Sequence, residues 1–109
     1  MIAKNTKNIN KFKKREEQIL TGTVNILIEH LPPSKIVLFG SRSKGKNGKH
    51  ADFDVAIDCK KPTISIQRKI NAEIETISGL FSVDIIYMQS VDKDFMEIIL
   101  TTGRVIYDK

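Results

Sequence analysis

The hydrophobic positions of the chain follow a helical period in two long stretches. Between about Phe12 and Leu31, and again between Ile66 and Ile77, apolar residues recur three and four positions apart. This spacing places them on one face of a helix and predicts two amphipathic helices. Pro32-Pro33 ends the first helix, because proline cannot continue it, and Gly79 is the expected C-cap of the second.

Four shorter stretches have the character of strands. Ile36–Phe39 is a continuous apolar run, which is typical of a central strand buried on both faces. Polar and apolar residues alternate from Asp52 to Asp58, as in a half-buried strand. Ser82–Tyr87 is a run of apolar, mostly β-branched residues interrupted by one acid, and residues 104–107 could form a last short strand.

A third helix is expected between the last two strands. Ser90 is the predicted N-cap, followed by Asp92 and Asp94 in the first turn, where the helix dipole favours negative charge. Gly103 would close this helix. The side chains expected to face the core are those of Phe95, Ile98 and Ile99.

The order of elements predicts an α/β (α+β) fold, in which a small mixed sheet packs against helices on one face. Residues 1–109 would form a single domain, since the chain has 109 residues and a 40% hydrophobic content. Residues 1–11 have little apolar content and are expected to form a flexible, basic N-terminus.

The second strand carries the first candidate site. Asp52 and Asp54 share one of its faces, because successive side chains in a strand point to opposite sides. Two carboxylates held this close repel each other unless they are protonated or bridged by a cation, and oxygen ligands of this kind suit Mg²⁺. The simpler alternative is a solvated acidic strand face. Asp58 is interpreted as a turn or capping residue beyond metal reach, and His30 as a surface or capping residue.

A glycine–serine turn follows the first strand. Gly40 allows close approach of the backbone to a ligand, and Ser41 offers a hydroxyl and an N–H group to a phosphate. Taken alone, such a pair is often only a turn. Cationic residues and glycines then alternate along the loop: Arg42, Lys44, Gly45, Lys46, Gly48, Lys49 and His50.

Together these residues form the pattern Gly-Ser, ten residues, Asp-x-Asp, from Gly40-Ser41 to Asp52 and Asp54. This pattern resembles the minimal nucleotidyltransferase (MNT) family of the polymerase-beta-like nucleotidyltransferase superfamily, and the resemblance covers roughly residues 20–107. It implies the nucleotidyltransferase fold and a third carboxylate on a neighbouring strand, which Asp84 would supply. An aspartate hydrogen-bonded to backbone in the core is the alternative for Asp84.

The resemblance also implies a mechanism and roles for these residues. An acceptor oxygen attacks the α-phosphorus of a nucleoside triphosphate, which the resemblance implies to be ATP, with two Mg²⁺ ions as cofactors. Asp52, Asp54 and Asp84 are the expected catalytic residues and metal ligands. The expected nucleotide-binding residues are Gly40, Ser41, Arg42 and Lys44.

The charge distribution and the composition limit the classes of partner that the sequence predicts. Residues 1–50 carry a net charge of +8 and residues 51–109 a net charge of −3, so the basic half favours an anionic partner such as a triphosphate, RNA or an acidic protein. Few aromatic residues accompany the cations, which argues against direct nucleic-acid binding as the main role. The single Cys59, a basic start without an apolar signal region and the absence of a membrane-length apolar run predict a cytoplasmic protein without a membrane partner.

Minimal nucleotidyltransferases are commonly encoded beside a HEPN-domain protein, which in several pairs is an RNase toxin. The resemblance therefore implies an antitoxin that adds AMP to a toxin hydroxyl, a tyrosine in those pairs. It also implies that a partner protein completes the acceptor site, because the extra acceptor domain of larger nucleotidyltransferases is not expected here. Two alternatives stay open: a non-catalytic antitoxin that acts by binding, and an enzyme that modifies a small molecule such as an aminoglycoside.

Overall fold

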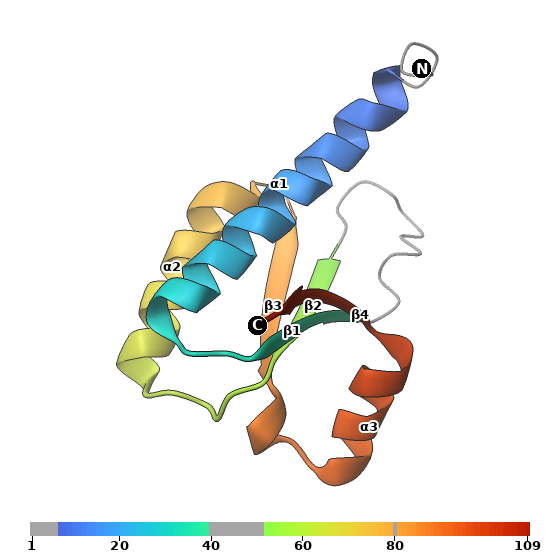
Figure 1. Ribbon diagram of the computed structural model, residues 1–109. Coiled ribbons are helices and arrows are strands. Elements are labelled where there is room, and N and C mark those ends of the chain that lie inside the picture. The colour runs from blue at the N-terminus through green and yellow to red at the C-terminus, as the bar shows by residue number, and fades with distance from the viewer. Residues whose placement is uncertain (1–6, 40–51, 80) are drawn as a thin grey trace.

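A four-stranded mixed sheet forms the centre of the protein (Figure 1). The computed structural model describes residues 7–39, 52–79 and 81–109. The strand order is β3-β2-β1-β4. Strand β1 pairs antiparallel with both β2 and β4, whereas β2 and β3 run parallel. The strands are β1 (Lys35–Phe39), β2 (Asp52–Ile57), β3 (Ser82–Tyr87) and β4 (Arg104–Asp108).

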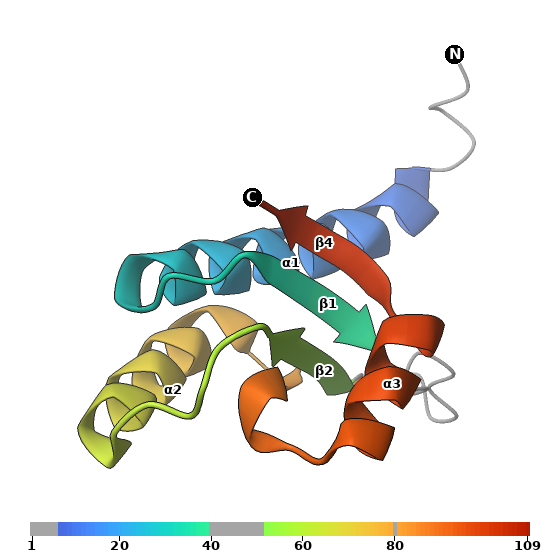
Figure 2. The ribbon, with the colours of Figure 1, turned by 60° about the horizontal axis from the view of Figure 1, so that its bottom comes forward.

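Helices lie on both sides of this sheet. The long helices α1 (Lys7–His30) and α2 (Ile64–Ser78) lie side by side over one face, and the shorter α3 (Lys93–Thr102) lies on the other side (Figure 1, Figure 2). A single 3-10 turn, η2 (Met88–Ser90), connects β3 to α3. The predicted α/β fold with a small mixed sheet is confirmed, but the expectation that all helices lie on one face is wrong, because α3 packs on the opposite face, against Val37 and Ala56.

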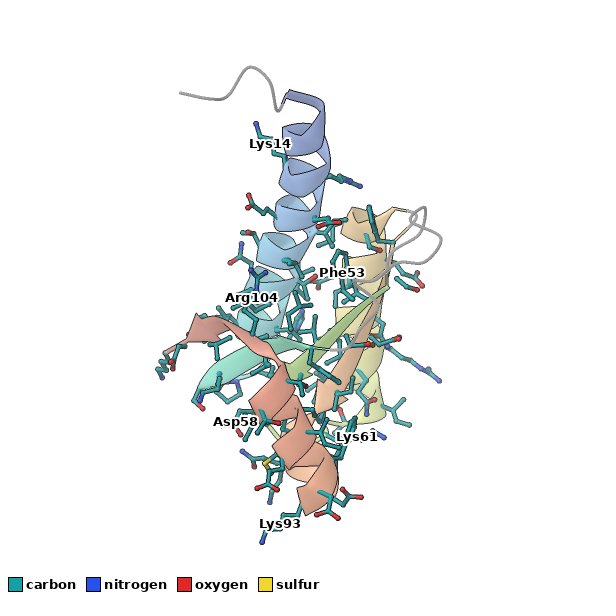
Figure 3. All side chains as sticks on the ribbon, turned by 90° about the vertical axis from the view of Figure 1, so that its right-hand side faces the viewer. Lys14, Phe53, Asp58, Lys61, Lys93 and Arg104 are labelled. Atoms are coloured by element: carbon teal, nitrogen blue, oxygen red, sulfur yellow. The ribbon has the colours of Figure 1, made fainter. Side chains whose placement is uncertain are left out.

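The beginning of α1 differs from the sequence prediction. Residues 7–11 were expected to be part of a flexible terminus, but α1 already begins at Lys7. Residues 1–6 lie outside the described part of the chain. The first turns of α1 extend beyond the rest of the protein, with Lys14 near this end and Lys93 at the opposite end of the molecule (Figure 3). Most of the stability of a helix comes from packing an apolar face against the rest of the protein. Residues 7–11 have few apolar side chains, so their sequence did not predict a helix.

The main core lies between the sheet and the two long helices. Phe53, Val55 and Ile57 of β2 are at most 4% exposed and pack there, as the alternating pattern predicted. Helix α1 contributes Ile19 and Leu27. The other buried members of this core are Ile36, Cys59, Ile70, Ile74 and Tyr87.

The buried face of α1 is rotated relative to the predicted stripe. The helical period of the apolar residues between Phe12 and Leu31 predicts that Ile28 is buried with Leu27, but Ile28 is 38% exposed, whereas Ile19 and Thr23 are fully buried. The Thr23 hydroxyl donates a hydrogen bond of 2.8 Å to the Ile19 carbonyl oxygen, which allows a polar side chain to be buried there. Within the described residues, no helix is both long and apolar enough to span a membrane.

A smaller core lies on the opposite face of the sheet, under α3. It contains Val37, Ala56, Met88 and Ile99, with Phe39, Ile86 and Met96 packed against it. Ile99 is fully buried, as predicted. The expectation that Ile98 also faces the core is wrong, because it is 54% exposed, whereas Phe95 lies at the margin of this core, 36% exposed with its ring against Phe39.

The caps of the helices were predicted with mixed success. Gly79 is the C-cap of α2, with a positive φ of 61° that favours glycine, and Gly103 closes α3. The predicted N-cap Ser90 is wrong. Asp92 caps α3, because its carboxylate accepts a 2.8 Å hydrogen bond from the backbone N–H group of Phe95. The Ser90 hydroxyl instead accepts a hydrogen bond from the backbone N–H group of Lys61.

Asp58 lies in a bend directly after β2 and links this bend to two other segments of the chain through hydrogen bonds of its carboxylate. Its carboxylate accepts a 2.8 Å hydrogen bond from Ser34, which precedes β1, and one of 3.0 Å from Gln89 in η2. The Gln89 bond, followed by the Ser34 bond, lowers the pKa of Asp58 below its usual value.

The lowered pKa of Asp58 leads to a prediction about acid stability. A carboxylate with a depressed folded-state pKa stabilises the fold above its unfolded pKa of about 3.9, and this contribution is lost as the pH falls through the folded-state pKa. We expect Asp58→Asn to lower the free energy of unfolding by about 1 kcal/mol at neutral pH, with the difference shrinking as the pH falls below about 3.9. Urea titrations across this range would test it. A difference that is independent of pH would contradict the role of the charge.

Candidate active site

Two of the three predicted catalytic aspartates meet across the parallel strand pair. Asp54 of β2 lies directly opposite Asp84 of β3 in the register of the sheet. Residues in register on neighbouring strands point their side chains to the same face, and the strands are about 4.8 Å apart. The structure therefore brings together two carboxylates that are separated by 30 positions in the sequence.

The pair lies on the face of the sheet that α3 only partly covers. Asp54 alternates with Phe53 and Val55, which point into the main core, so its carboxylate is on the other side. Asp54 is half-buried and Asp84 is exposed. The alternative interpretation of Asp84 as an aspartate in the core is therefore wrong.

The neighbours of Asp54 on its other side connect the pair to the expected phosphate-binding turn. Phe39, the last residue of β1, lies opposite Asp54, and its ring packs edge-to-face on Phe95 of α3 at 6.0 Å between centroids. Gly40 and Ser41 follow Phe39 directly in the chain. These two residues, with Arg42 and Lys44, lie outside the described residues, so their predicted contacts with the nucleotide remain predictions.

Asp52 occupies the first position of β2, two residues before Asp54 and opposite Ser82. Its backbone position agrees with the alternation on which the prediction depended. The side chain of Asp52 lies outside the described part of the structure, so its role as a metal ligand stays a prediction.

The chemistry of the pair fits a hard divalent cation. Two carboxylates in register on neighbouring strands repel each other when both are ionised, and like charges directly opposite each other destabilise a sheet. A cation bound between them would turn this repulsion into attraction. Their oxygen atoms are the ligands that Mg²⁺ prefers, and exposure of Asp84 leaves room for water and substrate oxygens.

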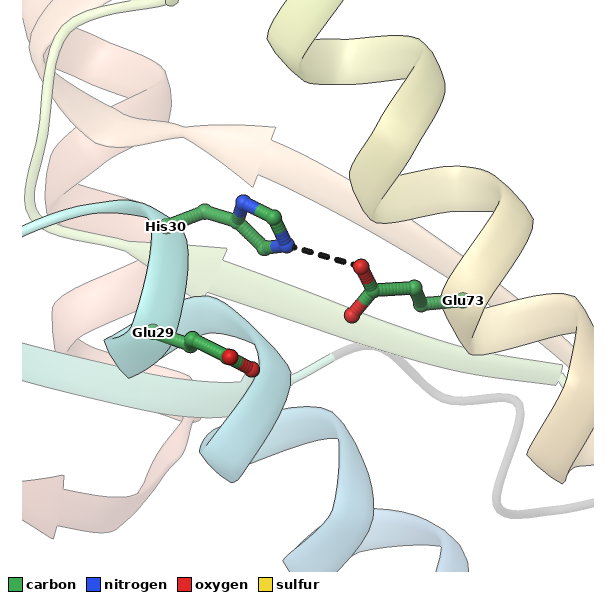
Figure 4. Close-up of side chains that lie close together, drawn as sticks. All are labelled: Glu29, His30 and Glu73. Carbon is green, nitrogen blue, oxygen red and sulfur yellow. Dashed lines mark hydrogen bonds and ion pairs between the residues drawn. The ribbon is translucent and has the colours of Figure 1, made fainter.

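A second group of possible metal ligands lies elsewhere. Glu29 and His30 at the end of α1 approach Glu73 of α2, and their ligand atoms lie within 4.8 Å of one another (Figure 4). His30 Nε2 is 3.0 Å from Glu73 Oε2, which links the two helices. Because α1 and α2 cover the opposite face of the sheet, this group is separate from the Asp54–Asp84 pair. The structure thus gives His30 a partner that its sequence context did not indicate.

Sequence reasoning also missed a groove next to Asp84. It has a volume of about 770 Å³ and lies between α2 and β3. Polar side chains of α2 form one wall, and residues of β3, including Asp84, form the other. Finding this groove requires the strand order, because only an edge strand leaves such space beside a helix.

Comparison with known proteins identifies the family. Residues 22–109 match the family described as "Polymerase beta, Nucleotidyltransferase". The chain is 35% identical over 97 residues to a probable protein adenylyltransferase MntA of Haemophilus influenzae, across 88% of this chain and 83% of the relative.

Solved structures show the same fold. One is a toxin–antitoxin crystal structure with AMP-PNP, with a TM-score of 0.66 and 19% identity over 82% of this chain and 73% of the other. Another is a mutant of the toxin–antitoxin MntA-HpeT, with a TM-score of 0.60 and 23% identity over 79% of this chain and 69% of the other. At these identities the structures establish similarity of fold alone.

Proposed function

The chain belongs to the polymerase beta nucleotidyltransferase family, as a member of its minimal type, and from this premise we propose that it is a Mg²⁺-dependent protein adenylyltransferase. It would transfer AMP from ATP to a hydroxyl group of a HEPN-domain toxin and so act as the antitoxin of that pair. The observation that carries this proposal is the register that places Asp54 opposite Asp84 on an accessible sheet face. The relative named as a probable protein adenylyltransferase supports the reaction, and the toxin–antitoxin neighbours support the type of partner.

The described residues suggest how the reaction would proceed. Asp54, with Asp52, would hold two Mg²⁺ ions on the sheet face, and Asp84 would share the ion nearer the acceptor. Bound Mg²⁺ neutralises triphosphate oxygens and makes a hydroxyl more acidic. Asp84 is exposed, so its carboxylate is accessible to the acceptor and can take the hydroxyl proton.

In the proposed reaction one phosphorus–oxygen bond forms and one breaks. The acceptor oxygen forms a bond to the α-phosphorus, the bond from that phosphorus to pyrophosphate breaks, and pyrophosphate leaves with the electron pair. Gly40 and Ser41 would hold the β- and γ-phosphates, and Arg42 and Lys44 would balance their charge. Cys59 is the single cysteine of the sequence and cannot form an internal disulfide, which supports placing the reaction in the reducing cytoplasm.

Intact-mass measurement of the partner would test the proposal. The chain is co-expressed with the HEPN-domain protein, and the purified complex is incubated with ATP and Mg²⁺. We expect the partner to gain one or more AMP units, and Asp52→Asn to abolish this gain. Asp108→Asn is a matched control, because it makes the same change at an exposed position of β4, the strand at the far edge of the sheet.

Two results would contradict the proposal. A stable complex in which the partner gains no mass would favour an antitoxin that acts by binding. A gain that persists in the Asp52→Asn variant would show that Asp52 is not required for the transfer.

A further inference from the structure

One edge of the sheet has a backbone without a described partner strand. Strand β3 is the first strand in the order β3-β2-β1-β4, so half of its backbone N–H and C=O groups point away from β2. Proteins usually protect such an edge with lysine, proline or a bulge, because it can pair with another chain. Within the described residues, Ser82–Tyr87 contains no cation or proline and pairs with β2 in unbroken register.

The opposite edge of the sheet is protected in more ways than β3, whose one charged residue is Asp84. Strand β4 carries charged residues at both ends, Arg104 and Asp108. Its pairing with β1 is also interrupted by a register shift between Ile36 and Val37. The two edges therefore differ, and the regular edge is the one that carries Asp84.

A polar stripe of α2 faces the groove beside β3. Gln67, Asn71, Glu75 and Ser78 are four and three residues apart, so they lie on one side of the helix. The carboxamides of Gln67 and Asn71 can both donate and accept hydrogen bonds. The groove extends along β3 from Ser82 to Tyr87, which is about 17 Å of strand.

The charge of the groove favours a basic ligand. The charged residues among its described lining are Glu75 and Asp84, both acidic. The groove therefore differs from the basic N-terminal half of the sequence, which suits the anionic triphosphate. The Asp84 carboxylate points to the other face of the sheet, toward the proposed metal site, so Glu75 is the carboxylate that a lysine or arginine of a bound segment complements.

We propose that the edge of β3 is the docking site for the acceptor, which binds there as an extended segment of the partner protein and adds a strand to the sheet. This inference rests on the proposed function and specifies how its substrate binds. Main-chain hydrogen bonds to β3 supply affinity, and the α2 stripe contacts alternate side chains of the segment. A basic residue of the segment lies near Glu75.

The register of such a strand would determine which residue is modified. A residue directly opposite Asp84 points to the same sheet face as Asp84, with the Cβ atoms about 5 Å apart. Asp54 lies on the other side of Asp84 on that face. A serine, threonine or tyrosine at this one position of the segment therefore presents its hydroxyl to the carboxylate pair, whereas its immediate neighbours point to the other face.

A matched pair of variants on α2 tests this inference. Asn71→Arg places a bulky cation in the groove, whereas Ala72→Arg places the same side chain one residue further on, at an exposed position outside the groove lining. Both changes suit a helix, since arginine is a good helix former. We expect Asn71→Arg to reduce AMP transfer to the HEPN-domain partner at least 10-fold at subsaturating partner concentration, with unchanged ATP binding, and Ala72→Arg to stay within 2-fold of the unmodified protein.

Hydrogen exchange gives a readout that does not depend on transfer. On addition of the partner to the unmodified protein, we expect slower exchange of the amides of Ser82–Tyr87, and Asn71→Arg should remove this protection. Transfer without protection of β3, or equal transfer by the two arginine variants, would overturn the inference alone. Protection without transfer would overturn the proposed function and leave the β3 edge as a partner-binding site. The absence of both would overturn both.

Discussion

Replacing Asp54 with asparagine is expected to lower the rate of AMP transfer by about 100- to 1000-fold, while the protein stays folded. Asparagine has nearly the same volume, but it removes the negative charge that the metal site requires. Loss of a single charge-stabilising group in an active site typically costs 10²–10³-fold, and even outer-shell partners of a metal ligand matter 10–100-fold. The rate is measured by stopping the reaction at a series of times, at saturating ATP and Mg²⁺, and determining how much AMP the partner has gained.

The same variant separates a metal ligand from a structural aspartate. Asp54 is half-buried, and the substitution removes one of two like charges facing each other on β2 and β3. We therefore expect the free energy of unfolding without Mg²⁺ to change by less than about 1 kcal/mol. Mg²⁺ should raise the melting temperature of the unmodified protein more than that of the variant. A variant that unfolds at room temperature would show that Asp54 has a structural role.

The largest effect on stability is expected from Gly103→Ala. A Cβ atom at this position would collide with Val37 and lie 2.7 Å from the carbonyl oxygen of Ile99 and 3.2 Å from that of Leu38. Two of these neighbours are backbone atoms, one in the last turn of α3 and one in β1, so a rotamer change cannot relieve the collision. We expect a loss of about 2–3 kcal/mol, which lowers the melting temperature by roughly 10–20 °C in a domain of this size.

Gly22→Ala is the matched control for this prediction. Its added Cβ would lie 2.6 Å from Ile77 Cδ1, the end of a flexible side chain that can rotate away. Alanine is also favoured over glycine inside a helix by about 0.5–1 kcal/mol. The two glycine-to-alanine changes should therefore differ by at least about 2 kcal/mol in a urea titration. Similar stabilities for both variants would contradict the close packing of α3 against β1.

The sequence predicted the strands and the faces of the sheet well, because alternation has a fixed physical meaning. Phe53, Val55 and Ile57 had to share a face, and this left Asp54 on the other one. The meeting of Asp54 and Asp84 was expected only from the family resemblance. Register between strands that are joined by a long crossover depends on tertiary packing, which a single sequence does not display.

The sequence predictions were wrong where two neighbouring residues could fill the same structural role. Ser90 and Asp92 are both good N-cap residues, and the 3-10 turn that contains Ser90 decides in favour of Asp92. In α1, the hydroxyl of Thr23 is hydrogen-bonded, so this polar residue can lie on the buried face of the helix. A prediction from hydrophobicity alone does not expect this, and it assigned the exposed Ile28 to the buried face. The groove beside β3 follows from strand order, and no short-range pattern encodes it.

The Asp54–Asp84 pairing also has a consequence for folding. Strands β2 and β3 are connected through α2, so the residues that pair between them are distant in sequence. During folding, the two strands can therefore pair in a shifted register. A slip of one residue would turn Asp84 toward the main core and move Val83 and Ile85 out of it. Burying an unpaired carboxylate costs several kcal/mol, which exceeds the repulsion between two accessible aspartates. The same acid that is proposed to act in catalysis therefore excludes the nearest misfolded alignment of the sheet.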